Sequence, residues 1–210
     1  MEIISPSHKI MSPIDTDLIM LKLEECGRTA YKSEDKITPG SAEKFIKSIM
    51  KRGHESVIEH VSLTVRFICD RGVTHELVRH RLVAYTQEST RYCNYHKRGI
   101  QVIRPPFWHN EYHLYSHWIH AMEFAETAYD YLIENGATPQ EARSVLPNSL
   151  KTEIVCTTNL REWRHILKLR TSKAAHPQMR ELMVPLLREL QEKLPVIFGD
   201  IGEEEDPHNE

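Results

Sequence analysis

The clearest pattern along the chain is a strict alternation of apolar and polar residues between positions 60 and 69. Every second side chain there is apolar: Val61, Leu63, Val65, Phe67 and Cys69. A period of two is typical of a strand that buries one face. We therefore predict a strand over 60–69. Apolar runs also predict a strand over 150–157 and a short one over 98–104, which Pro105 and Pro106 end.

Helices are predicted where apolar residues recur every three or four positions. Their approximate bounds are 41–52, 74–83, 114–133, 138–146, 159–169 and from 177 onward. Local signals support several of these ends, because Gly53 and Gly136 suit helix C-termini and Thr138 with Glu141 forms a capping box. Pro185 is expected to kink the last helix.

Helices and strands alternate without repeats, and no linker divides them. This order predicts one α+β domain over residues 1–198. Residues 199–210 carry six acidic side chains and no lysine or arginine. Such a segment holds too little apolar surface to pack, so we predict a flexible, solvated tail there.

Composition narrows the class of protein. The chain has 210 residues, of which 40% are hydrophobic and 27% charged, and these values are typical of a globular domain. No run approaches the roughly 18 apolar residues of a membrane span, and the first residues do not resemble a secretion signal. We therefore expect a cytoplasmic protein that does not bind a membrane.

The cysteines are scattered and form no CxxC pair. They are Cys26, Cys69, Cys93 and Cys156. This spacing predicts four reduced thiols rather than a zinc site or a disulfide framework. Because Cys69 and Cys156 lie in apolar runs, packing is their expected role and a cysteine nucleophile is not favoured.

Positive charge is concentrated in the middle of the chain. The formal net charge is -3, yet residues 66–104 hold eight lysines and arginines against three acids. Within this stretch, residues 79–91 read RHRLVAYTQESTR. Arginine and hydroxyl groups together match the geometry of phosphate, so Ser89, Thr90 and Arg91 predict a pocket for a phosphate-bearing ligand.

The triplet Arg79, His80 and Arg81 cannot serve one pocket if it lies on the predicted helix. Successive helical residues turn by about 100°, so at least one of the three must face elsewhere. Two readings follow from this geometry. Either one arginine pairs structurally with a carboxylate, or the segment lies where subunits meet and contributes to more than one site.

The triplet RHR is followed by seven residues and then Ser89. This spacing resembles the signature of the flavin-dependent thymidylate synthases of the ThyX type. The segment GHESVIEH at 53–60 is also similar to that family, as are Arg143 in EARSVLP, Asn159 in TTNLR and Arg170 in LKLR. The resembling segments follow the family's order over about 120 residues, which makes the match far more specific than RHR alone.

The resemblance implies a reaction, a fold and an assembly. It implies that dUMP is methylated to dTMP, with 5,10-methylenetetrahydrofolate as carbon donor and with FAD taking electrons from NADPH. It also implies a mainly antiparallel sheet flanked by long helices, and a homotetramer whose active sites are shared between subunits. Shared sites would account for a triplet that faces in more than one direction.

The resemblance carries roles to individual residues. Implied FAD contacts are Ser56, Arg79, His80, Arg81, Gln87, Asn159, Leu160, Arg161 and His165. Implied dUMP contacts are Glu76, Leu77, Val78, Arg79, Gln87, Glu88, Ser89, Thr90, Arg91, Arg143 and Arg170. Arg170 is the implied catalytic residue, because a guanidinium at the uracil edge would stabilise negative charge that develops on the ring.

Ser89 is assigned to phosphate rather than to nucleophilic attack. A serine nucleophile needs an adjacent base, and the sequence places none beside it. In a flavoenzyme the cofactor carries the redox chemistry, so a catalytic cysteine is not required. The segment after Arg170 is longer than the form typical of the family, so His176 and Gln178 are given no role.

Two other classes of function stay open at the level of sequence. His109, His113 and His117 are four residues apart, and His54–Glu55 with Glu59–His60 adds imidazoles and carboxylates, so a metal-dependent hydrolase is conceivable. The spacing does not match HExxH, and no metal is assigned. The basic stretch 66–104 could instead bind nucleic acid, although the net charge of -3 and the lack of a binding motif disfavour it.

Overall fold

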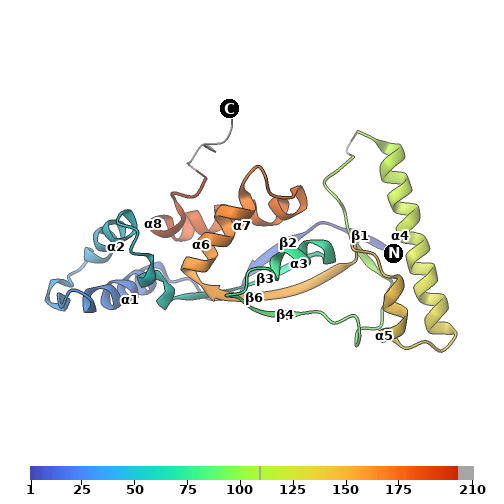
Figure 1. Ribbon diagram of the computed structural model, residues 1–210, viewed down its shortest axis with the longest axis horizontal. Coiled ribbons are helices and arrows are strands. Elements are labelled where there is room, and N and C mark those ends of the chain that lie inside the picture. The colour runs from blue at the N-terminus through green and yellow to red at the C-terminus, as the bar shows by residue number, and fades with distance from the viewer. Residues whose placement is uncertain (109, 203–210) are drawn as a thin grey trace. The chain divides into compact units, whose positions relative to one another are not determined.

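The computed structural model describes residues 1–108 and 110–202 (Figure 1). Its α-helices are α1 (Thr16–Thr29), α2 (Ser41–Lys51), α3 (Arg71–Leu77), α4 (Tyr112–Glu134), α5 (Pro139–Ala142), α6 (Leu160–Thr171), α7 (Pro177–Lys193) and α8 (Pro195–Phe198). Short 3-10 helices are η1 (Glu34–Lys36), η2 (Glu55–His60) and η3 (Arg143–Val145). The strands are β1 (Glu2–Ile4), β2 (Ser7–Ile10), β3 (Ser62–Asp70), β4 (Ala84–Gln87), β5 (Gln101–Ile103) and β6 (Lys151–Asn159). The predicted α+β class is confirmed.

The main sheet has four strands in the order β2-β3-β6-β4 and is antiparallel, as expected. A second, two-stranded sheet pairs β1 with β5 in parallel, with Ile3 opposite Val102. The alternating residues of β3 that were predicted to face the core are all buried. Strands β3 and β6 are the longest in the described part of the chain. Each leads directly into a helix that carries predicted site residues.

The chain forms two compact units, which are described separately below. Unit 1 consists of 1–9, 66–81 and 85–156, and unit 2 of 10–65, 82–84 and 157–210. Whether residues 1–198 act as a single domain stays a prediction. Most of the predicted tail, 203–210, lies outside the described residues, and of its first residues Ile201 is buried in unit 2.

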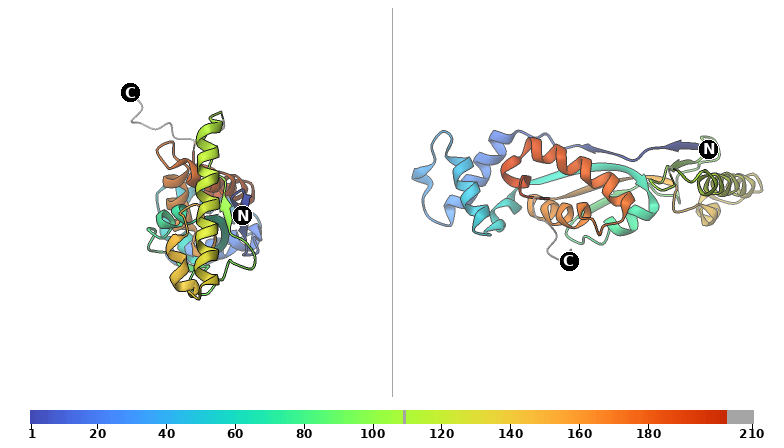
Figure 2. Two further views of the ribbon diagram at one scale, coloured as in Figure 1. Left: turned by 90° about the vertical axis from the view of Figure 1, so that its right-hand side faces the viewer. Right: turned by 90° about the horizontal axis from the view of Figure 1, so that it is seen from above.

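Unit 1 is organised around the long helix α4. Its core contains Ile100, Val102, Met122 and Leu150, with Trp118 packed against them. Helix α4 also packs against α5 and η3, which lie beside it in Figure 2 (left). These contacts fix the position of α5, the element that precedes Arg143.

Unit 2 is mainly helical. Helix α6 packs against α7 and η2, and α1 packs against α2; the pair α6 and α7 is visible in Figure 2 (right). Trp163 of α6 is fully buried, and its indole Nε1–H donates to the carbonyl oxygen of Leu63 in β3 at 3.1 Å. Helix α6 is therefore fixed against the first half of β3.

Some predicted bounds are wrong. The helix expected over 74–83 begins at Arg71, because the buried carboxylate of Asp70 caps it by accepting from the Val73 N–H at 2.7 Å. It ends at Leu77, so the RHR triplet follows the helix instead of lying on it. The helix expected over 138–146 changes to a 3-10 turn at Arg143.

Candidate active site

In unit 1 the chain leaves β4 and makes a tight turn at Ser89. The N–H groups of Tyr92 and Cys93 both donate to the Ser89 carbonyl oxygen, at 3.2 and 3.0 Å. The Arg91 N–H points to the Ser89 hydroxyl oxygen at 3.3 Å. The Ser89 hydroxyl and the Arg91 guanidinium are thus gathered within three residues. Such a set of donors suits a phosphate.

Arg91 is exposed and directed by α5. Its Nε–H donates to the Oε1 atom of Gln140 at 2.9 Å, and its guanidinium lies 5.5 Å from the centre of the Tyr92 ring. Helix α5 begins with the predicted capping box, in which Glu141 accepts from both the backbone and the side chain of Thr138. Arg143 follows three residues after Gln140 and is exposed. The structure therefore brings Arg91 to the helix that precedes Arg143.

Gln140 was not predicted as a site residue. Nothing local marks it, because its partner Arg91 is 49 residues away in the sequence.

Gln87 and Glu88, both predicted ligand contacts, bind other residues of unit 1. The Gln87 amide Nε2 donates to the hydroxyl oxygens of Thr74 and Thr152, at 3.1 and 3.3 Å. Glu88 accepts from Tyr95 and Lys151. Both side chains are half-buried, and their roles toward a ligand stay predictions.

The RHR triplet lies in a turn between α3 and β4. Arg79 and Arg81 are exposed, whereas His80 is buried, with 6% of its surface exposed. The Tyr85 hydroxyl donates to the carbonyl oxygens of Leu77 and His80 and so holds the turn closed. The expectation that the three side chains do not share one environment holds, although the helix on which it was argued ends before them.

The other predicted dUMP contacts on α3 differ in exposure. Glu76 is half-buried, Leu77 is buried, and Val78 is 41% exposed. Thr90, at the turn, is also buried. Of these four side chains, only those of Val78 and Glu76 are exposed enough to contact a ligand.

In unit 2 three of the predicted site residues, Asn159, Arg161 and His165, line a cavity of about 540 Å³. The cavity is lined by Glu55, Glu59, Leu82, Asn159, Arg161, Glu162, Arg164, His165 and Lys168. Asn159 caps α6, because its Oδ1 accepts from the Glu162 N–H at 2.9 Å, as the cap-like pair predicted. Leu160 is buried and is not among the residues that line the cavity, and Ser56 is exposed on η2.

Carboxylates hold the arginines of this cavity. Arg161 Nη1 donates to Glu59 Oε1 at 2.6 Å. Arg164, only 3% exposed, contacts Asp200 at 2.7 Å and Glu55 at 3.3 Å through Nη2. The hydrogen bond and positive charge of Arg164 lower the pKa of the Asp200 carboxyl. None of these pairs could be read from the spacing of the sequence.

The cavity combines three carboxylates with guanidinium, imidazole and amide donors, a mixed lining that suits the polar groups of a large ligand such as a dinucleotide cofactor. Arg161, His165 and Asn159 offer guanidinium, imidazole and amide groups around one space. The buried Nε of Arg164 has no hydrogen-bond partner among the described residues. A buried donor without a partner is costly, so a ligand atom or a water molecule is expected there.

Arg170 lies near the C-terminal end of α6 and is half-buried. It is nine residues after Arg161, which corresponds to about 13.5 Å along a helix. It is not among the residues that line the 540 Å³ cavity. Unit 2 therefore does not bring the predicted catalytic arginine together with Arg161 and His165 in that cavity.

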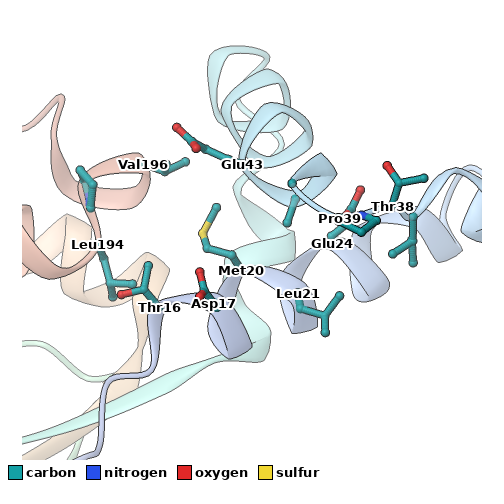
Figure 3. Close-up of a pocket in the computed structure, with 14 residues that line it drawn as sticks. Thr16, Asp17, Met20, Leu21, Glu24, Thr38, Pro39, Glu43, Leu194 and Val196 are labelled. Carbon is teal, nitrogen blue, oxygen red and sulfur yellow. The ribbon is translucent and has the colours of Figure 1, made fainter.

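A second cavity in unit 2, of about 660 Å³, contains none of the predicted site residues (Figure 3). Its labelled side chains come from α1, from α2 and the segment before it, and from the start of α8. The lining is mainly aliphatic, and its buried carboxylate, Glu24, already accepts from Arg28 and Ser41. This cavity offers little chemistry despite its size.

The alternative metal ligands do not gather in the part of the chain that is described. His113 and His117 are exposed on α4, with His117 Nδ1 2.9 Å from the His113 carbonyl oxygen, and His109 lies outside the described residues. No group of three potential ligands includes these histidines or those of η2, within the described residues. Within the described residues, these histidines therefore do not form the metal site that the sequence left open.

The buried thiols are poor nucleophiles. Burial raises the pKa of Cys156 to about 12, and it raises the pKa of Cys69 further. Both thiols are therefore protonated at neutral pH. Among the described helices, none is long and apolar enough to cross a membrane.

Comparison with known proteins defines the class. Residues 20–196 match the family described as thymidylate synthase complementing protein. The chain is 34% identical over 197 residues to the flavin-dependent thymidylate synthase of Corynebacterium glutamicum, covering 85% of this chain and 78% of the relative. It is 32% identical over 184 residues to that of Pyrococcus furiosus, covering 86% and 75%.

The chain therefore belongs to the flavin-dependent thymidylate synthase family. Among solved structures, its fold is similar to that of a UMP/dUMP methylase, PolB from Streptomyces cacaoi, which was crystallised with 5-Br dUMP. The TM-score is 0.80 at 23% identity, and the match covers 95% of this chain and 96% of the other. At this identity the likeness concerns the fold.

Proposed function

We propose that this protein is a flavin-dependent thymidylate synthase that converts dUMP to dTMP. The methylene carbon of 5,10-methylenetetrahydrofolate becomes bonded to C5 of the uracil and replaces the C5 proton. Two electrons from NADPH reduce that carbon to a methyl group, and tetrahydrofolate and NADP⁺ are released. FAD, when bound, accepts hydride from NADPH and delivers it onward.

The observation that carries the proposal is the Ser89 turn in a chain of this family. Ser89 and Arg91 place a hydroxyl and a guanidinium within one turn, and the Arg91 N–H donates to that hydroxyl. Arg91 is exposed, and Gln140 orients it from α5. We assign these groups to the dUMP phosphate, with Arg143, Glu76 and the other predicted dUMP contacts except Glu88 around the rest of the nucleotide.

The flavin is assigned to the predicted set that includes Asn159, Arg161 and His165. Their cavity in unit 2 brings guanidinium, imidazole and amide groups around one space, which suits the polar edge of a flavin. Leu160, whose side chain is fully buried, belongs to the same predicted set. Ser56, Gln87 and the RHR triplet complete the proposed flavin contacts.

Arg170 is proposed to polarise the uracil. A guanidinium donates two parallel hydrogen bonds and stays charged at all relevant pH values. Placed against the carbonyl and N3 edge of the ring, it would stabilise the negative charge that develops as C5 becomes nucleophilic. Its loss should therefore lower the rate more than the affinity for dUMP.

Assembly and location complete the proposal. We propose a cytoplasmic homotetramer whose active sites draw residues from several subunits, as the family resemblance implies. The exposed apolar side chains of α4, Phe124 and Tyr131, are 75% and 65% exposed and are consistent with a surface that a second subunit covers.

The test is formation of dTMP, quantified by chromatography. Purified protein is incubated with FAD, NADPH, 5,10-methylenetetrahydrofolate and dUMP, and each is omitted in turn. Arg170→Ala should lower kcat about 100-fold or more while FAD stays bound. Arg188→Ala, an exposed arginine on α7 with no assigned role, is the matched control. Normal turnover by Arg170→Ala would refute the mechanism, and no dTMP from the wild type would refute the function.

A further inference from the structure

Glu88 is the one acidic residue between Arg79 and Arg91. Its carboxylate accepts from the Tyr95 hydroxyl at 2.8 Å through Oε1 and from Lys151 Nζ at 3.1 Å through Oε2. Its backbone N–H donates to the Glu153 carbonyl oxygen at 2.8 Å. Its own carbonyl oxygen lies 3.5 Å from Arg71 Nη1. Every polar part of this residue is thus engaged within unit 1.

The partners of the carboxylate are themselves fixed. Lys151 also contacts Glu153 Oε1 at 3.0 Å, and both Lys151 and Glu88 are less than a fifth exposed. The Tyr95 ring packs edge-on against the buried Tyr129 ring, with centroids 5.9 Å apart. Burial, followed by the bond to Glu88, raises the pKa of Tyr95, so its hydroxyl stays a neutral donor.

The direction of the Glu88 carboxylate matters because Glu88 is next to Ser89, the residue assigned to the phosphate. A carboxylate next to a phosphate-binding serine would repel the phosphate if both faced the same side. Successive side chains of an extended segment point in opposite directions. Gln87 accordingly reaches Thr74 and Thr152, whereas Glu88 reaches Tyr95 and Lys151. The negative charge is turned away from the expected ligand and lies against Lys151, which Glu153 also contacts.

We infer that Glu88 is a positioning residue for the nucleotide phosphate: through Tyr95 and Lys151 it sets the geometry of the Ser89–Arg91 turn without touching the substrate. This inference rests on the proposed function. The family resemblance counts Glu88 among dUMP contacts, whereas the structure assigns its carboxylate to the protein. Tyr95 and Lys151, to which the family resemblance assigns no role, become part of the phosphate-binding apparatus.

The experiment compares dUMP with deoxyuridine, which lacks the phosphate. Dissociation constants for both are measured by titration calorimetry on the FAD-loaded protein. Glu88→Ala should weaken dUMP binding about tenfold, as loss of hydrogen bonds to a charged group implies, and leave deoxyuridine binding unchanged. Tyr95→Phe, which keeps the ring packing, should weaken dUMP binding about threefold. At saturating dUMP, kcat should stay within about twofold in both.

The matched control is Glu153→Gln. It removes a carboxylate from the same Lys151 but leaves both bonds of the Glu88 side chain and the backbone bond to Glu88 in place. Its dUMP affinity should stay within about twofold of the wild type. Glu88→Gln, which can still accept from Tyr95, should retain more affinity than Glu88→Ala.

Three results would overturn the inference. Unchanged dUMP affinity in both Glu88→Ala and Tyr95→Phe would show that the contacts do not position the turn. An equal loss for dUMP and deoxyuridine would indicate direct contact with the nucleoside or general disruption. Wild-type protein that binds no dUMP would refute the proposed function as well, whereas wild-type binding with unaffected variants would refute only the role of Glu88.

Discussion

Two junctions of this protein have the same local design and differ in what surrounds them. Each is a nine-residue strand that ends on the residue capping the next helix: β3 with Asp70 before α3, and β6 with Asn159 before α6. In unit 1 the following arginines, Arg79 and Arg81, are exposed in a turn. In unit 2 Arg164 is buried and held by carboxylates.

The two junctions therefore hold their arginines in different ways. At the α3 junction the backbone is fixed by side chains, Asp70 at one end and Tyr85 at the other, and the arginines project from it. At the α6 junction the arginine charges are compensated within unit 2 before any ligand binds. At the α3 junction the positive charge of the arginines stays available to a ligand. At the α6 junction part of the positive charge is paired with carboxylates of the same unit.

The largest expected effect comes from the buried arginine. Arg164→Met should lower the free energy of unfolding by about 3 kcal/mol, because it leaves the carboxylates of Glu55 and Asp200 without their buried partner. Urea denaturation followed by circular dichroism measures the change. Arg161→Met is the matched control on the same helix, and its exposed side chain should leave the midpoint almost unchanged. Equal midpoints for the two variants would show that burial does not distinguish these arginines.

The caps test whether the two junctions are equivalent. Asp70→Ala and Asn159→Ala each remove a side-chain acceptor at a helix N-terminus, and each should cost about 1 kcal/mol of stability. Only Asn159→Ala should also weaken FAD binding, because Asn159 lines the cavity assigned to the flavin. Fluorescence titration with FAD measures this second effect. Equal FAD affinities for the two variants would contradict that assignment.

The pKa of Asp200 predicts how acid affects unit 2. Because Arg164 lowers this pKa in the folded protein, the unfolded state binds the proton first as pH falls below the ordinary value of 3.8. The stabilisation is complete above that value and is lost as pH falls through the folded pKa. Tm measured from pH 6 to pH 2.5 should show wild type above Asp200→Asn at pH 6, with the gap closing below pH 4. A gap that stays constant would argue against this coupling.

The smallest expected effect concerns the exposed ion pair between Arg161 and Glu59, which line the cavity assigned to the flavin. Glu59→Gln should strengthen FAD binding about twofold to threefold, because it releases the Arg161 guanidinium from its carboxylate partner. Glu43→Gln, which breaks the more exposed pair with Lys47 on α2, is the control and should not change FAD affinity. Weaker FAD binding in Glu59→Gln would mean that Glu59 orients Arg161 instead of competing for it.

What the sequence could predict was set by local chemistry. The buried face of β3 and the caps at Thr138 and Asn159 depend on residues at most a few positions apart, and all were confirmed. The end of α3 was wrong because Tyr85, from the following strand, holds the carbonyl oxygens of Leu77 and His80. The helix propensity of the residues around Leu77 does not reveal that contact.

Elements held by distant partners were not predicted. β1 gains its strand form by pairing with β5, about a hundred residues further along, and neither it nor α1 was foreseen. The same holds within the candidate site. The pairs Glu88–Lys151 and Arg161–Glu59 are 63 and 102 residues apart, so only the folded chain reveals which arginines and carboxylates meet.

Flavin reduction in the presence and absence of dUMP tests the central claim most directly. The purified protein is loaded with FAD, freed of excess cofactor and mixed anaerobically with NADPH while the visible spectrum is recorded. The account predicts that the flavin bleaches and that dUMP changes the rate of bleaching, as expected if the Ser89 turn and the flavin cavity serve one reaction. A protein that retains no FAD, or whose bleaching is indifferent to saturating dUMP, would contradict it.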